Sequence, residues 1–299
     1  MTFGLVLGAG GLPGEAFHRG VLRALHEGYG LDGRAADVVV GTSAGSIVAA
    51  SLRRPRPGQA VPPAPGEDAP LSATLTQARR LRPLPDVLGL AGYAVRPWRL
   101  RPGRLVAAAL PAGRHSTAIL SEPLERRFGH DWPTACTWVV AARRRDGRRV
   151  VFGRDRFDVD LPTAVAASCA IPGYFRPVVI QGEQHVDGGV HSPTNADLLA
   201  GQRLDLVVVS APMGVEPTGA RPVVGLPLRL AWHAQLAHEV AALRRAGSEV
   251  VVVEPGGGLL RSLGLNPVTA LRLDEVEERA YERAAALIAR RPQVAAEAA

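Results

Sequence analysis

Two short apolar runs, each followed by glycines and a helical pattern, constrain the fold of this 299-residue chain most strongly. The first covers residues 3–8 and leads into a helical pattern over about 14–28; the second covers 37–40 and leads into one from Ser43. Apolar strands that alternate with helices are typical of a parallel sheet covered on both faces. The sequence therefore predicts an α/β fold with a mainly parallel central sheet.

The rest of the chain predicts further strands and helices around one unusual region. From about 53 to 113 the chain is rich in proline, glycine and arginine, which predicts an insertion over one edge of the sheet. A surface loop and a lid or acyl-chain wall both remain open for it. We expect a single domain over 1–299 that contains this insertion. Strands are predicted at 136–142, 149–153, 176–180, 184–186, 204–210 and 248–255, and helices at 161–171, about 225–246 and about 267–290.

Composition narrows the class of protein. Hydrophobic residues make up 46% of the chain, which favours a globular fold. The net charge is +7 and all 35 basic residues are arginine, but no run matches a nucleic-acid-binding motif, so no nucleic-acid partner is expected. Neither a membrane-spanning stretch nor a secretory signal is visible, which predicts a cytoplasmic protein, with peripheral membrane contact as an option. The two cysteines, Cys136 and Cys169, are expected to be buried, reduced thiols.

A serine in the pattern Gly-x-Ser-x-Gly follows the second apolar run. Ser43 lies between Gly41 and Gly45, with a predicted strand before it and a predicted helix after it. This is the context of a nucleophile elbow, in which a tight turn exposes the serine and its neighbours must be small. The other interpretation is a chance turn in which Ser43 caps the helix. The strand and helix on either side favour a nucleophilic serine.

The glycine run after the first strand has two candidate uses. A dinucleotide-binding loop needs a third glycine at the position that Pro13 occupies, so a nucleotide site is disfavoured. Beside a nucleophilic serine, the N–H groups of Gly10, Gly11 and Leu12 could instead bind the oxyanion of an acyl-transfer intermediate.

A nucleophilic serine needs a base, and the sequence offers two kinds. None of the histidines has the spacing of a metal site, so no metal is expected, and a triad with a histidine such as His233 is an alternative. Asp187, followed by Gly188 and Gly189, ends a short predicted strand and could reach the serine directly. An ordinary Asp-Gly turn is equally compatible with that pattern.

Four segments resemble bacterial patatin-like phospholipases in their order and spacing. These segments are "GAGGLPGEAFHRGVL", "GTSAG", "ASCAIPGYFRPV" and "DGGVHSP", and the resemblance covers roughly residues 4–55 and 160–210. It implies a three-layer α/β/α fold and a Ser-Asp dyad without a catalytic histidine. By position, it implies that Ser43 is the nucleophile, Asp187 its partner and residues 10–12 the oxyanion hole, with no cofactor.

The chain departs from this family at one position. Family members usually carry arginine or lysine where this sequence has Pro13, which has neither a charge nor an N–H group. Arg19 lies more than one turn further along the predicted helix and is a candidate substitute for the missing cation.

The sequence thus predicts a serine acyl hydrolase that cleaves lipid carboxylic esters through an acyl-enzyme. The substrate class would be a phospholipid, a lysophospholipid or a less specific ester. The alternatives are a histidine-dependent triad, a catalytically weak protein that binds a lipid or a partner, and a nucleotide-binding oxidoreductase. Neither the lipid nor the oligomeric state follows from the sequence.

Overall fold

The computed structural model describes residues 1–54, 113, 115–217, 225–263 and 272–290. The predicted insertion at about 53–113 lies almost wholly outside these described residues, and so does the first part of the helix predicted at about 267–290.

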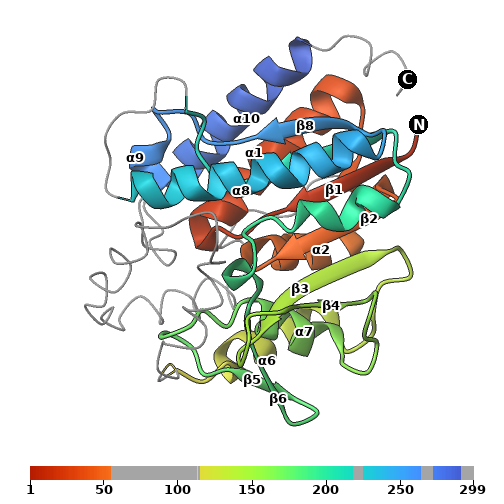
Figure 1. Ribbon diagram of the computed structural model, residues 1–299, viewed down its shortest axis with the longest axis vertical. Helices are drawn as coiled ribbons and strands as arrows, with labels where there is room; N and C mark the ends of the chain where they lie inside the picture. Colours follow the sequence, from red (N-terminus) through yellow and green to blue (C-terminus); the bar gives the residue numbers. More distant parts are fainter. Residues whose placement is uncertain (55–112, 114, 218–224, 264–271, 291–299) are drawn as a thin grey trace.

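The described residues form one eight-stranded sheet in the order β5-β6-β3-β2-β1-β7-β8, with β4 paired to β3 (Figure 1). Strands β1, β2, β3, β7 and β8 pair in parallel, whereas β4, β5 and β6 pair antiparallel. The α/β fold with a mainly parallel sheet is therefore confirmed. The strands are β1 (Phe3–Leu7), β2 (Val38–Thr42), β3 (Thr137–Arg143), β4 (Arg149–Phe152), β5 (Val178–Ile180), β6 (Glu183–Asp187), β7 (Leu206–Ser210) and β8 (Glu249–Val253).

Helices cover both faces of this sheet and make three layers (Figure 1). In β1, for example, Leu5 packs with α1, α2 and α10, whereas the next residue, Val6, packs with α8 on the other face. Successive side chains of a strand point to opposite faces, so an all-apolar strand is buried on both sides. The helices are α1 (Gly11–Tyr29), α2 (Ala44–Arg53), α6 (Ala118–Phe128), α7 (Leu161–Ser168), α8 (Leu226–Arg245), α9 (Leu260–Leu263) and α10 (Leu273–Ala289).

Four details differ from the sequence-based expectations. Helix α1 begins at Gly11, three residues earlier than expected, because Pro13 falls in the first turn, where its missing N–H group would have no partner. Helix α6 was not expected, and α7 ends at Ser168 rather than near 171. The expectation that both cysteines are buried was wrong for Cys136, which is exposed just before β3; Cys169 is buried.

Helix α10 packs closely along α1, and a glycine permits the approach. A Cβ atom on Gly20 would lie 2.1 Å from the Glu277 carbonyl oxygen and 2.8 Å from the Tyr281 nitrogen, both backbone atoms. Gly28, also on α1, is different, because its Cβ would meet only the Ile288 side chain, at 3.0 Å.

We therefore expect Gly20→Ala to lower the free energy of unfolding by about 1–3 kcal/mol, the usual effect of overpacking. Gly28→Ala is the matched control and should change the free energy of unfolding little. Its gain in helix propensity, up to about 1 kcal/mol, offsets the tight contact with the Ile288 side chain. Urea unfolding of both variants measures the difference. Equal midpoints for the two variants would contradict this account of the α1–α10 contact.

Candidate active site

Ser43 occupies a strained turn between β2 and α2. Its φ of 54° and ψ of −124° lie where a residue with a side chain is rarely found. Three hydrogen bonds hold the turn: its N–H donates to Ser168 Oγ at 2.8 Å, and its carbonyl accepts from the N–H and the hydroxyl of Ser46, at 2.8 and 2.6 Å. The backbone of Ser43 is thus fixed on both sides of the side chain.

The glycines that flank Ser43 leave no room for larger residues. A Cβ on Gly45 would lie 1.9 Å from the Leu7 carbonyl oxygen at the end of β1. A Cβ on Gly41 would lie 2.6 Å from the Ser46 Cα atom. The small neighbours that a nucleophile elbow requires are therefore also required by the contacts of this turn.

Strands β2 and β6 lie on the same edge of β3 and meet end to end. On one edge, Thr42 of β2 pairs with Val140, and Asp187 of β6 pairs with the next residue, Ala141. The other edge of β3 is occupied at these same two positions by β4. Since β2 is parallel to β3 and β6 is antiparallel to it, the last residues of β2 and β6 face each other.

The turn after Asp187 closes this junction. A Cβ on Gly188 would lie 2.2 Å from the Val140 carbonyl oxygen and 3.0 Å from Thr42 Cγ2, so the chain crosses directly over the end of β2. A Cβ on Gly189 would lie 3.4 Å from the Cβ of Ala9, which places the same turn against the glycine loop. The structure thus brings Ser43, Asp187 and the glycine loop to one place.

Asp187 is a buried acid beside a hydroxyl. Only 6% of the residue is exposed, and its Oδ1 accepts the Gly189 N–H at 2.7 Å. Burial raises the pKa of Asp187 to about 6, although hydrogen bonding from the Ser43 side chain and from the Gly189 N–H opposes the shift. At neutral pH the carboxyl group is therefore mostly ionised and able to accept a proton.

The glycine loop presents backbone N–H groups at the start of α1. Gly11 has a φ of 60°, and Gly10 is pressed against Pro212, whose Cγ would lie 2.7 Å from an added Cβ. Among the described residues, no hydrogen bond takes the N–H groups of Gly10, Gly11 or Leu12. Free N–H groups at a helix N-terminus favour negative charge.

His233, the alternative base, and His18, a buried histidine of α1, both have other partners. His233 Nδ1 lies 2.7 Å from Glu254 Oε2, beyond the end of β8, and β2 is three strand spacings away, roughly 14 Å. His18 Nε2 lies 2.8 Å from the Gly8 carbonyl, which can only accept, so Nε2 carries the proton and Nδ1 accepts from the Ser210 hydroxyl at 2.7 Å. Burial lowers the pKa of His18 to about 4, so it stays neutral and links α1 to β1 and β7.

Sequence analysis missed two residues beside Ser43. Ser168, the last residue of α7, accepts the Ser43 N–H and donates to the Val140 carbonyl at 2.6 Å, which ties the turn to β3. Cys169 Sγ lies 3.8 Å from Ser46 Oγ, and burial together with the nearby Asp187 charge raises the pKa of this thiol, which stays protonated. Their only signal was the segment "ASCAIPG", which the local pattern predicted as the end of a helix. The family resemblance included this segment but implied no role for either residue.

Arg19, the candidate substitute for the cation missing at Pro13, is engaged elsewhere. Pro13 is buried in the first turn of α1. Arg19 donates from Nε to Glu277 Oε2 of α10 at 2.9 Å, so its charge is paired away from the glycine loop.

No group of three or more metal-ligating side chains is found in the part of the chain that the structure describes. None of the described helices is both long and apolar enough to cross a membrane.

Comparison with known families identifies the chain. The sequence model of the patatin-like phospholipases matches residues 5–200, about two thirds of the 299 residues. This chain belongs to the patatin-like phospholipase family. The match begins within β1 and ends at residue 200, so it includes the glycine loop, Ser43 and Asp187.

Curated mycobacterial proteins are similar to this chain over most of its length. Proteins named "uncharacterized NTE family protein" from Mycobacterium bovis and Mycobacterium tuberculosis are 29% identical to it over 218 residues, 73% of this chain. The chain spans about half the length of these curated relatives, 51%.

Two solved structures are similar to it at low sequence identity. VipD from Legionella pneumophila is 14% identical with a TM-score of 0.43, and the similarity covers 97% of this chain and 67% of VipD. The type III effector protein ExoU is 16% identical with a TM-score of 0.36, and the similarity covers 97% of this chain and 53% of ExoU.

Proposed function

We propose that this patatin-like protein is a serine hydrolase of lipid carboxylic esters, with Ser43 as nucleophile and Asp187 as its base. The observation that carries the proposal is the junction of β2 and β6, where the Ser43 side chain faces a buried carboxylate. No histidine is needed in this scheme, and His233 is engaged by Glu254 elsewhere. Family membership supports the lipid ester as the substrate class.

Each proposed step uses a group at this junction. Asp187 accepts the hydroxyl proton as Ser43 Oγ bonds to the ester carbonyl carbon, and the carbonyl oxygen becomes an oxyanion. The N–H groups of Gly10, Gly11 and Leu12 stabilise that oxyanion. Collapse of the intermediate breaks the ester bond, and Asp187 returns the proton to the departing alcohol. Water, deprotonated by Asp187, then attacks the acyl-enzyme, and Asp187 passes that proton to Ser43 Oγ as the acid is released.

The environment of Asp187 suits a base. A carboxylate of ordinary pKa is a weak base near neutral pH, and the raised pKa of Asp187, about 6, brings it closer to the pH at which it would work. The same burial excludes water that would weaken its interaction with the serine hydroxyl.

A catalytically weak lipid- or partner-binding protein is the alternative that the absence of a cation at Pro13 favours. The two functions differ in turnover. A short-chain nitrophenyl ester and a panel of dispersed lipid classes, each tested with the wild-type protein and Ser43→Ala, separate them. Hydrolysis that depends on Ser43 supports the enzyme, and binding without hydrolysis supports the alternative.

We expect Ser43→Ala to abolish ester hydrolysis and Asp187→Asn to lower kcat by about 10²- to 10⁴-fold, the usual contribution of a positioned base. His233→Gln is the matched control, because it alters the alternative base and should leave kcat within a few-fold of wild type. Steady-state kinetics with circular-dichroism melts of each variant provide the test. If His233→Gln is as damaging as Asp187→Asn in a folded protein, a triad replaces the dyad.

The rate should also depend on pH through Asp187. Because the base must be ionised, kcat/KM should fall as the pH drops through about 6, approaching tenfold per pH unit below it. Protonation of Asp187 does not itself unfold the protein, since a buried carboxyl with a raised pKa stabilises the folded state when it becomes protonated. His18 acts in the opposite direction, because its lowered pKa of about 4 costs stability as the pH falls below its ordinary value, so the fold is checked at each pH. A kcat/KM profile from pH 4.5 to 8.5, with circular dichroism at each pH, measures this fall on the acid side. A flat profile down to pH 4.5 would exclude Asp187 as the base.

A further inference from the structure

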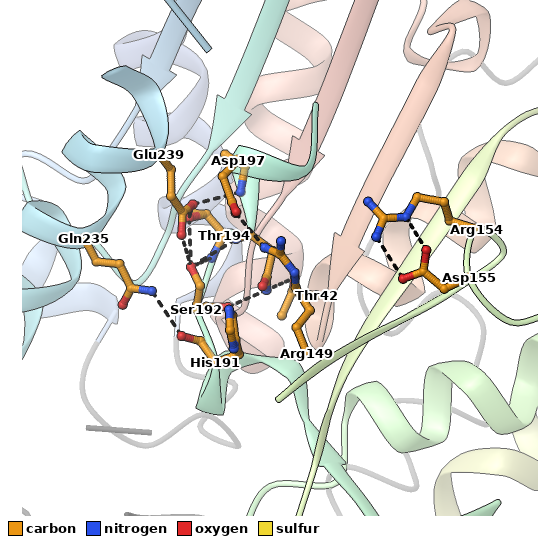
Figure 2. A network of polar contacts seen from close by, with 12 residues as sticks. Thr42, Arg149, Arg154, Asp155, His191, Ser192, Thr194, Asp197, Gln235 and Glu239 are labelled. Atoms are coloured by element: carbon orange, nitrogen blue, oxygen red, sulfur yellow. Dashed lines mark hydrogen bonds and ion pairs between the residues drawn. The ribbon is translucent and has the colours of Figure 1, made fainter. Parts of the chain in front are cut away.

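A buried acid on α8 holds the chain segment that follows Asp187 (Figure 2). Glu239 is 7% exposed, and both of its carboxylate oxygens are engaged. Oε1 accepts the Ser192 hydroxyl at 2.5 Å, and Oε2 accepts the Thr194 hydroxyl at 2.6 Å and the Ala196 N–H at 2.8 Å. One side chain of α8 therefore accepts three hydrogen bonds from a segment of five residues, 192–196.

A second residue of α8 holds the start of the same segment. Gln235 lies four positions before Glu239, one helical turn, so both side chains point to the same side of the helix. Its Nε2 donates to the His191 carbonyl at 3.0 Å. Segment 191–196, which begins three residues after Gly188, is thus attached to α8 at both ends.

Asn195 connects this segment to the strand that carries Ser43. It is fully buried and has a φ of 54°, an uncommon conformation for a residue with a side chain. Its Nδ2 donates to the Ser192 carbonyl at 2.6 Å and to Thr42 Oγ1 at 3.2 Å. Thr42 immediately precedes Ser43, and the Ser192 N–H donates to the Gly188 carbonyl at 3.2 Å. The segment held by Glu239 therefore contacts both β2 and the turn that follows Asp187.

We propose that Glu239 is a positioning residue, which sets the Asp187 carboxylate against the Ser43 hydroxyl through segment 191–196 and Asn195. The inference rests on the proposed function. Glu239 belongs to α8, which packs on the face of the sheet opposite to α1 and α2, and it contacts neither Ser43 nor Asp187. It also lies outside the matched family segment, residues 5–200.

The chemistry of the contact fits a carboxylate at this position. Two hydroxyls and one backbone N–H converge on it, and an ionised carboxylate is the side-chain group that only accepts. Bonds to a charged acceptor are shorter and stronger than neutral ones. Burial raises the pKa of Glu239, and the hydrogen bonds from Ser192 and Thr194 oppose that shift in part. An apolar side chain here would leave the Thr194 hydroxyl and the Ala196 N–H buried without this partner.

Loss of the Glu239 hydrogen bonds should lower kcat more than it changes substrate binding. Segment 191–196 would be released from α8, and the turn at Gly188 and Gly189 would shift over the end of β2. Misplacement of a reacting group by about 1 Å lowers a rate by about 10²-fold. Because Glu239 lies away from any bound ester in this scheme, KM should change little.

The test compares Glu239→Ala with Leu243→Ala, one turn further along α8. Leu243 is fully buried in the same core, so both variants remove a buried side chain from one helix. At a temperature well below both melting transitions, Glu239→Ala should lower kcat about 10²-fold with KM unchanged, and Leu243→Ala should retain wild-type kcat. Glu239→Gln, which keeps the length and one acceptor oxygen, should fall between wild type and Glu239→Ala.

A second readout is independent of hydrolysis. The Gly189 N–H, bonded to Asp187 Oδ1, should exchange with deuterium faster in Glu239→Ala than in Leu243→Ala, measured under native conditions. Wild-type kcat in a folded Glu239→Ala protein, or an equal loss in Leu243→Ala, would overturn the positioning role. If the wild-type protein hydrolyses no ester, the proposed function fails on its own, and the Gly189 exchange rates still decide whether Glu239 holds the turn.

Discussion

The junction between the ends of β2 and β6 is the constraint on which the rest of the site depends. Both strands use one edge of β3 and run toward each other, so Thr42 and Asp187 sit opposite neighbouring residues of the same strand. A one-residue shift of β6 would turn the Asp187 side chain to the other face of the sheet. Register, rather than any single contact, therefore places the carboxyl group beside Ser43.

This junction is energetically unfavourable by itself, and its surroundings stabilise it. The pKa of Asp187 is about 6 rather than 3.8, so burial destabilises its ionised form by about 3 kcal/mol relative to an exposed aspartate. The backbone conformation of Ser43 adds about 1–3 kcal/mol of strain. Ser168 ties the serine turn to β3, and Glu239 ties the aspartate segment to α8. Strain and a buried charge in one place, held by neighbours, are typical of catalytic sites.

The sequence predicted the parts of the fold that depend on local pattern. The apolar runs gave the parallel strands, and the helix expected at about 225–246 is α8, Leu226–Arg245. The strand, turn and helix around Ser43 are as the glycine spacing predicts. The assignment of roles to Ser43, Asp187 and residues 10–12 stays a prediction, supported by the geometry described above.

What the sequence could not predict depends on contacts between distant segments. No local pattern shows that β6 shares an edge of β3 with β2, because three strand pairings must be known together. Ser168 looks like any residue near a helix end, and Glu239 looks like a solvent-facing residue of an amphipathic helix. Cys136 was expected to be buried because its neighbours are apolar, yet it lies just before β3 begins, and it is exposed.

Reaction with a fluorophosphonate tests the central claim most directly, because it reports an activated serine without assuming a substrate. The account predicts a single adduct on Ser43, located by peptide mass spectrometry, that forms much more slowly in Asp187→Asn than in the wild-type protein. An unlabelled Ser43 in the folded wild-type protein, or an equal labelling rate in Asp187→Asn, would contradict it.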